Sequence, residues 1–126
     1  MLTVDANVIL RLILNDNEEM VKEIYAKLQE DTFLVKREII AEIIYVLTGV
    51  YKIDREKAGN VIFKVLETEG MFVESEDAVR YAITVYQARA LDFIDCMLYA
   101  YQKTENEKIF TFDKKLQKLL KIESAP

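Results

Sequence analysis

The sequence predicts an α/β layer fold whose sheet is mostly parallel. Four short apolar segments have the length of strands, longer segments with helical periodicity lie between them, and no proline occurs before residue 126. Strands that alternate with helices of about 10 to 15 residues are typical of βαβ units and of a parallel sheet. The 126 residues contain no internal repeat and no linker-like segment, so we expect a single domain over residues 1–126.

The four predicted strands are rich in aromatic and branched residues. The first and last, residues 1–4 and 108–112, each end directly before an aspartate, Asp5 and Asp113. The other two are expected within residues 31–35 and 70–73. In open parallel sheets the functional crevice lies at the carboxyl ends of the strands, so Asp5 and Asp113 are expected there.

The helices are predicted from apolar residues that recur at steps of three and four. In residues 18–30, Met20, Ile24 and Leu28 form such a stripe. Further helices are expected over residues 39–47, from Asp54 onward, and over residues 76–89, 93–101 and 114–120. The segment 39–47 is apolar nearly all round, which predicts a helix that is buried on most faces.

Composition narrows the chemistry before any motif is considered. The chain has one Cys and no His, which excludes a zinc finger, a Cys–His pair, a Ser–His triad and haem ligation through His. Its catalysis must use carboxylates, hydroxyls, amides, Lys or Arg. The opening residues lack the pattern of a secretory signal, and apolar stretches of about ten residues are too short to span a membrane, so we expect a cytoplasmic protein.

Five carboxylates lie among apolar residues, where an unpartnered charge is rarely tolerated. They are Asp5, Glu42, Asp92, Asp95 and Asp113. Each also has a structural interpretation: the aspartates suit the starts of helices, where Asp caps backbone N–H groups, and Glu42 can lie on a narrow polar stripe with Glu38.

Carboxylates that met in one crevice would repel one another. A hard divalent cation such as Mg²⁺ or Mn²⁺ would relieve that repulsion, because these ions prefer oxygen ligands. An acidic, oxygen-ligated site in an α/β fold favours phosphoryl chemistry, in which metal ions activate water and stabilise the leaving oxygen.

The order of these motifs resembles the PIN-domain ribonucleases, which include the VapC-type toxins of toxin–antitoxin pairs. Residues 4–10, Val-Asp-Ala-Asn-Val-Ile-Leu, look like the family's opening strand and first metal-binding acid, Asp5, accompanied by the polar Asn7. Glu42 corresponds to the glutamate within an apolar helix. Asp95 matches the third motif, and Asp92 would be an extra acid. Thr111-Phe112-Asp113 resembles the terminal Thr-x-Asp element, in which Thr111 would hold water or phosphate.

The resemblance implies a three-layer α/β/α fold with a central, mostly parallel sheet of four to five strands. It also implies a homodimer and a Mg²⁺- or Mn²⁺-dependent endoribonuclease that leaves a 5′-phosphate and a 3′-hydroxyl. Asp5, Glu42 and Asp95 would hold the first ion, and Asp113 with Asp92 would complete the site or help to bind a second. A toxin of this kind would have a cognate antitoxin protein as its partner.

Two other interpretations stay open. The chain is alternatively a non-catalytic PIN-like interaction module whose acids only cap helices. A phosphatase with Asp5 as nucleophile is disfavoured, because such enzymes usually carry Asp-x-Asp and residue 7 is Asn. Candidate phosphate contacts are Lys114, Lys115, Lys118, Arg11 and Arg37, which also suit ordinary solvated surfaces.

The net charge of −5, from 17 bases and 22 acids, first argues against a nucleic-acid partner. Setting aside the five candidate acids leaves 22 − 5 = 17 acids against 17 bases. The five acids of the predicted site then account for the excess negative charge, and bound cations would offset that charge.

Overall fold

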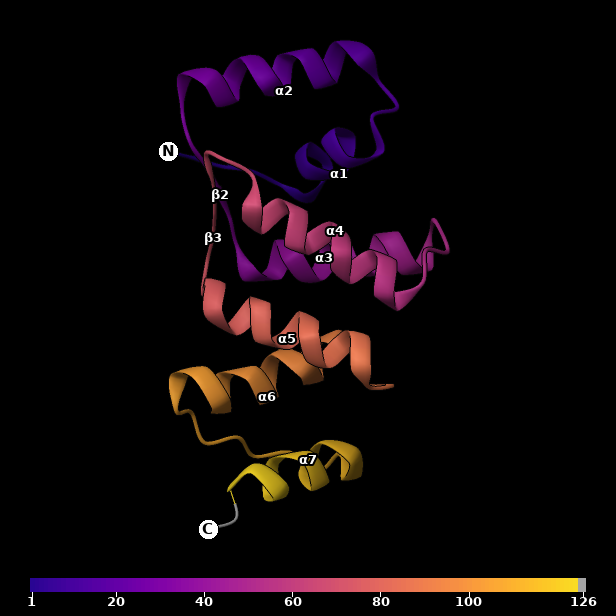
Figure 1. Cartoon of the computed structure of the whole chain (residues 1–126), viewed down its shortest axis with the longest axis vertical. Helices are drawn as coiled ribbons and strands as arrows, with labels where there is room; N and C mark the ends of the chain where they lie inside the picture. Colours follow the sequence, from indigo (N-terminus) through magenta and orange to yellow (C-terminus); the bar gives the residue numbers. More distant parts are fainter. Residues whose placement is uncertain (125–126) are drawn as a thin grey trace. The chain divides into compact units, whose positions relative to one another are not determined.

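The computed structural model describes residues 1–124, and the side chains of residues 1–121 (Figure 1). Its contacts divide the chain into two compact units, residues 1–76 and the residues from Asp77 onward. The first unit contains β1 (Leu2–Thr3), α1 (Ala6–Leu14), α2 (Glu18–Glu30), β2 (Phe33–Val35), α3 (Arg37–Gly49), α4 (Arg55–Glu67) and β3 (Met71–Val73). The helices α5 (Glu76–Ala88), α6 (Phe93–Glu105) and α7 (Lys114–Ser124) follow.

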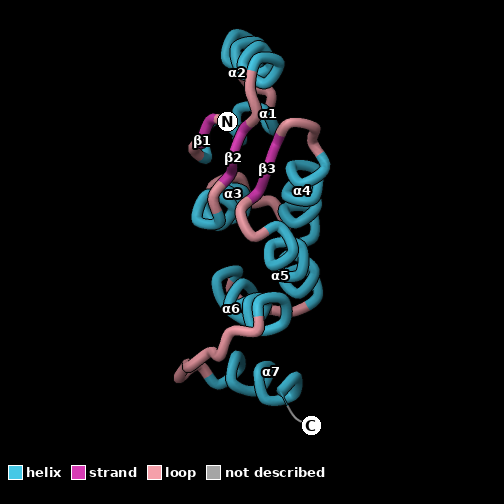
Figure 2. The backbone as a smooth tube through the Cα atoms, turned by 90° about the vertical axis from the view of Figure 1, so that its left-hand side faces the viewer, coloured by secondary structure: helices cyan, strands magenta, loops and turns pink. Residues whose placement is uncertain are grey.

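The first unit is built on a parallel sheet in the order β1-β2-β3 (Figure 2). Phe33 on the central strand is in register with Leu2 on one side and Met71 on the other. Two helices connect each strand to the next, as parallel neighbours require a crossover. The predicted α/β class and the parallel sheet are therefore confirmed, with three strands found in the described residues instead of the expected four to five.

The strand predicted over residues 108–112 is not formed, because these residues have no regular secondary structure. Phe110 and Phe112 are 88% and 84% exposed and contact each other edge to face, with ring centroids 5.3 Å apart. A strand exists only through ladder hydrogen bonds to a neighbour. The length of this segment and its aromatic and branched residues indicated a strand, but among the described residues no strand pairs with it.

Polar caps set the boundaries of most helices. Asn17 and Asp54 accept the N–H groups of Met20 and Lys57 at 3.0 and 2.9 Å, which starts α2 and α4. The C-terminal ends of two other helices, α1 and α6, are set by Asn15 and Asn106, whose φ angles of 50° and 56° lie in the left-handed region. Asparagine tolerates this conformation better than most residues, so the chain can leave the helix there.

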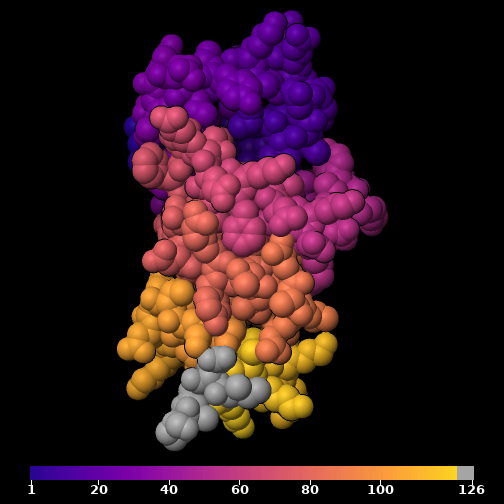
Figure 3. Space-filling model, viewed as in Figure 1, coloured from indigo at the N-terminus to yellow at the C-terminus, as the bar shows by residue number. Residues whose placement is uncertain are grey.

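Each unit has its own buried residues. In the first unit, α3 contributes Ile40, Ile43, Ile44 and Leu47, which are fully buried, and the strand residue Phe33 is 2% exposed. In the second unit, the rings of Tyr86 and Phe93 meet edge to face at 5.7 Å and join α5 to α6. The atoms of α7 lie against those of α6, and Leu116 of α7 is fully buried (Figure 3). No helix within the described part of the chain is long and apolar enough to cross a membrane.

Candidate functional site

Asp5 lies two residues after the end of β1 and caps α1. Its Oδ1 accepts the backbone N–H of Val8 at 3.1 Å, and the side chain is exposed. Asp5 also lines a pocket of about 420 Å³ with Val4, Val8 and Lys27 among its neighbours. The cap uses one oxygen, and a carboxylate has about four acceptor positions, so capping leaves Asp5 able to ligate an ion.

Glu42 is exposed on α3, on the side of the helix away from the buried isoleucines. Glu38 and Tyr45 lie on the same face, at steps of four and three residues, and Tyr45 is 42% exposed. The prediction of a helix buried on most faces is thus confirmed for residues 39–47, apart from the narrow exposed stripe that carries Glu42 and Tyr45. Glu42 occupies the polar stripe, where it is open to solvent and to a ligand.

In the second unit, Asp92 and Asp113 start two helices. Asp92 Oδ2 accepts the N–H of Ile94 at 3.3 Å and caps α6, and Asp113 Oδ1 accepts the N–H of Leu116 at 2.9 Å and caps α7. Asp95 lies in the first turn of α6, three residues after Asp92. The helix dipole favours negative charge at all of these positions.

The three acids of the second unit influence one another. Burial raises the pKa of the Asp95 carboxyl above its ordinary value, and the negative charges of Asp113 and Asp92 raise that pKa further. The carboxylates are therefore close enough to repel. Across the described residues, however, no three Asp, Glu, Cys or His side chains converge closely enough to hold a metal ion. Asp5 and Glu42 belong to the first unit and the other three acids to the second.

Thr111 positions Asp113. Its hydroxyl oxygen accepts the backbone N–H of Asp113 at 3.0 Å, and its carbonyl oxygen accepts the side-chain amide of Gln117 at 2.7 Å. Sequence reasoning missed Gln117, although its place four residues after Asp113 on a predicted helix was a usable signal. Asn7 is exposed in the first turn of α1, two residues from Asp5.

Two of the candidate basic residues are engaged within the first unit. Arg11 donates from Nη1 to both carboxylate oxygens of Asp16, at 2.9 and 2.7 Å. Arg37 pairs with Glu74 through Nε at 3.2 Å and donates to the Ser75 hydroxyl at 3.3 Å. The candidate lysines of α7, in contrast, are exposed: Lys114, Lys115 and Lys118.

Comparison with known proteins decides the family. Residues 2–121 match the PIN domain. The chain belongs to the PIN-domain family. It is 28% identical over 120 residues to a VapC ribonuclease of Aquifex aeolicus (strain VF5), an alignment that covers 91% of this chain and 89% of the relative. No solved structure matches the chain. The resemblance inferred from the sequence motifs is thus confirmed, and the PIN match includes all five candidate acids.

Proposed function

We propose that this PIN-domain chain is a Mg²⁺- or Mn²⁺-dependent endoribonuclease and the toxin of a toxin–antitoxin pair. The observation that carries the proposal is the PIN match over residues 2–121, which contains every candidate acid in the order in which the sequence predicted them. The similarity to a VapC ribonuclease along nearly the whole of both chains supports RNA as the substrate.

The donor set fits a hard divalent cation. Asp5, Glu42, Asp95 and Asp113, with Asp92, offer carboxylate oxygens, the ligands that Mg²⁺ and Mn²⁺ prefer, and the repulsion around Asp95 is the kind that a cation relieves. When bound, such an ion supplies activation of water and stabilisation of the leaving oxygen in phosphodiester hydrolysis. The lack of histidine does not oppose this chemistry.

The chain's own groups prepare each acid locally. Asp5, Asp92 and Asp113 lie at the starts of α1, α6 and α7, where backbone N–H groups and the helix dipole lower the cost of negative charge, including that of a phosphate. Thr111 fixes the backbone of Asp113 and offers a hydroxyl for water or phosphate. Asn7 offers a side-chain amide beside Asp5.

As a toxin, the protein would act in the cytoplasm as a homodimer and would be neutralised by a cognate antitoxin. The competing proposal is a non-catalytic interaction module. It is favoured by the capping bonds of Asp5, Asp92 and Asp113, since helix capping by itself explains why each of these acids is present.

A cleavage assay with matched variants separates the two proposals. Wild-type protein is expected to cut RNA with Mg²⁺ or Mn²⁺ and to stop in EDTA. Asp5→Asn and Asp95→Asn should lower the rate by about 10²–10³, the loss typical when a group that stabilises transition-state charge is removed. At residue 5, Asn retains the capping oxygen, and at residue 95 it removes a charge that its neighbours repel, so folding of both variants should persist in circular dichroism.

Asp54→Asn is the control. Asp54 caps α4 with the same geometry as Asp5 but is not a candidate ligand. Its rate should equal that of the wild type. Cleavage that persists in EDTA would overturn the metal dependence, and a rate that falls equally in all three variants would show that Asp5 and Asp95 have no special part in catalysis. A folded wild-type protein that cuts no RNA with Mg²⁺ or Mn²⁺ would support the interaction module instead.

A further inference from the structure

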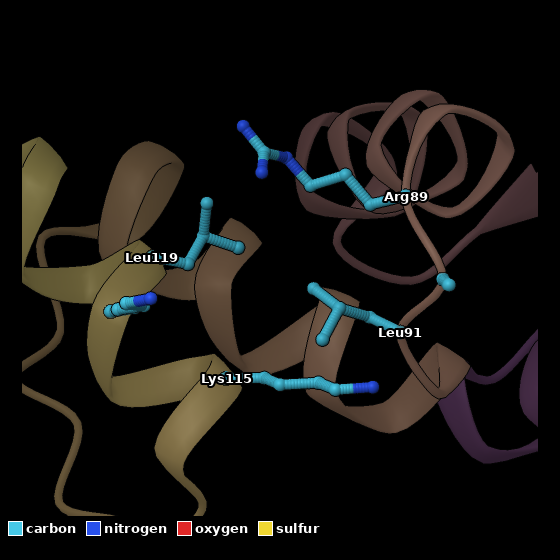
Figure 4. Close-up of a pocket in the computed structure, with 6 residues that line it drawn as sticks. Arg89, Leu91, Lys115 and Leu119 are labelled. Atoms are coloured by element: carbon cyan, nitrogen blue, oxygen red, sulfur yellow. The ribbon is translucent and has the colours of Figure 1, made fainter.

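A basic pocket lies in the second unit beside the acids. It has a volume of about 300 Å³ and is lined by Arg89, Ala90, Leu91, Lys115, Lys118 and Leu119. Leu91 and Leu119 point into the space between them, while the Arg89 guanidinium and the Lys115 side chain flank it on opposite sides (Figure 4). The pocket thus has an apolar floor and a cationic rim.

The charge of this rim is of one sign. Among the described residues, no acid lines the pocket, and neither Lys115 nor Lys118 forms an ion pair. A second hollow of about 370 Å³ shares Lys115 and Lys118 and adds Lys114 and Lys121. Residues 114–121 contain four lysines and no acid, so the cationic surface continues along α7.

Two residues that line the pocket lie close in the sequence to candidate acids. Leu91 immediately precedes Asp92, and Lys115 follows Asp113 by two residues. Because successive Cα atoms are about 3.8 Å apart, the backbone of Lys115 lies within about 7.6 Å of Asp113. A polynucleotide with one phosphate at Asp113 would therefore bring a neighbouring nucleotide to this pocket.

We propose that the pocket formed by Arg89, Leu91, Lys115, Lys118 and Leu119 binds a nucleotide of single-stranded RNA that flanks the cleaved phosphodiester. The inference rests on the proposed ribonuclease function and adds a substrate-binding subsite to it. Lys115, Lys118 and Arg89 contact phosphate oxygens, and the base lies on the apolar surface of Leu91 and Leu119.

A nucleotide suits both parts of the pocket. Its phosphate matches the cationic rim, and the flat face of any base can lie on an apolar floor without a sequence requirement. An acidic peptide would match the rim alone. The other candidate cations, Arg11 and Arg37, already pair with Asp16 and Glu74, which leaves the α7 face as the exposed basic surface of the original set.

Binding is measured by fluorescence anisotropy with a short labelled single-stranded RNA in EDTA, so that cleavage is not required. Each phosphate contact on a single strand contributes about 0.7 to the slope of log K against log salt. The double variant K115Q/K118Q should therefore bind about 25-fold more weakly than wild type at about 0.1 M salt, with a slope shallower by about 1.4.

Two further variants control for charge and folding. K57Q/K64Q removes two exposed lysines from α4 and should bind as wild type does. K115R/K118R keeps both charges and should restore binding.

If K115Q/K118Q binds RNA with the affinity and salt slope of the wild type, the proposal that the pocket binds RNA is wrong. It is also wrong if K57Q/K64Q loses as much RNA affinity as K115Q/K118Q. Competition by a polyglutamate peptide as strong as that by RNA would also overturn it. If K115Q/K118Q loses RNA binding while the wild type cuts no RNA with Mg²⁺ or Mn²⁺, the nuclease proposal fails and the pocket stands as an RNA-binding site.

Discussion

Asp5, Asp54, Asp92 and Asp113 each accept a backbone N–H at the start of a helix, with bond lengths between 2.9 and 3.3 Å. Capping geometry therefore does not distinguish a proposed ligand from a purely structural aspartate. The neighbouring charges distinguish them: Asp92 and Asp113 lie near Asp95 and raise its pKa, whereas Asp54 does not contribute to that shift. A single carboxylate can both start a helix and ligate an ion, since the two tasks use different lone pairs.

Glu74 shows how another acid stabilises the first unit. The Arg37 N–H donates to its Oε1 at 3.2 Å and holds the pKa of Glu74 below its ordinary value, although burial opposes this; Lys36 and Arg37 lower it further by their charges. Glu74 also bonds through its backbone N–H to the Val35 carbonyl at 2.9 Å. The side chain thus fastens the end of β3 to the start of α3.

Glu74→Gln is expected to lower the free energy of unfolding by about 1 kcal/mol at pH 7, since the pair is partly exposed. A folded-state pKa below the unfolded value of about 4.3 gives stability that is full above pH 4.3 and is lost as the pH falls through the folded pKa. Urea unfolding of both proteins should therefore show a difference at pH 7 that shrinks towards pH 3. A difference that is constant with pH would show that the charge of Glu74 is not its cause.

At the scale of elements, α7 tests whether Asp113 has a structural role beside its proposed ligand role. Asp113→Ala removes the oxygen that accepts the Leu116 N–H and should lower stability by about 1 kcal/mol. Asp113→Asn keeps a capping oxygen and should leave stability nearly unchanged. Thermal unfolding measures both, with Asp54→Ala and Asp54→Asn as the matched pair on α4. Equal stability of the Ala and Asn variants at residue 113 would show that the cap contributes nothing.

The elements that were predicted well are those whose signals are local. Residues 31–35 and 70–73 contain β2 and β3, and the start of α6 at Phe93 matches the prediction because Asp92 is a strong cap. The strand predicted over residues 108–112 is not formed, because strand formation depends on a pairing partner that aromatic and branched composition does not reveal. For α6, helical structure continues to Glu105, past the predicted end at residue 101, because apolar periodicity does not report an exposed last turn.

The candidate site shows the same limit. A search for acidic residues flanked by apolar residues found five candidate carboxylates, and the chain belongs to the PIN-domain family. Exposure was harder to read: Glu42 lies on an open polar stripe, since one face of an apolar helix can be solvated. The pocket at Arg89 depends on tertiary contacts between separate elements, and no spacing rule predicts it. The bond from Gln117 to Thr111 is local, and the place of Gln117 four residues after Asp113 was a signal for it.

For the whole molecule, the net charge of −5 equals the number of candidate acids. Without cations, the repulsion among Asp92, Asp95 and Asp113 opposes folding, so the protein should be less stable in EDTA than with a bound ion. An ion that binds only the folded state stabilises it by about 2.7 kcal/mol at a concentration of 100 Kd.

Mn²⁺ should therefore raise the melting temperature by about 10 °C, at about 4 °C per kcal/mol for a chain of this size. Differential scanning fluorimetry at constant ionic strength measures the shift. Asp54→Asn should keep it, whereas Asp95→Asn should lose most of it and, in EDTA, should melt no lower than the wild type, since the substitution removes a repelled charge. A shift that is absent in the wild type, or that Asp95→Asn retains in full, would show that these acids do not hold the ion.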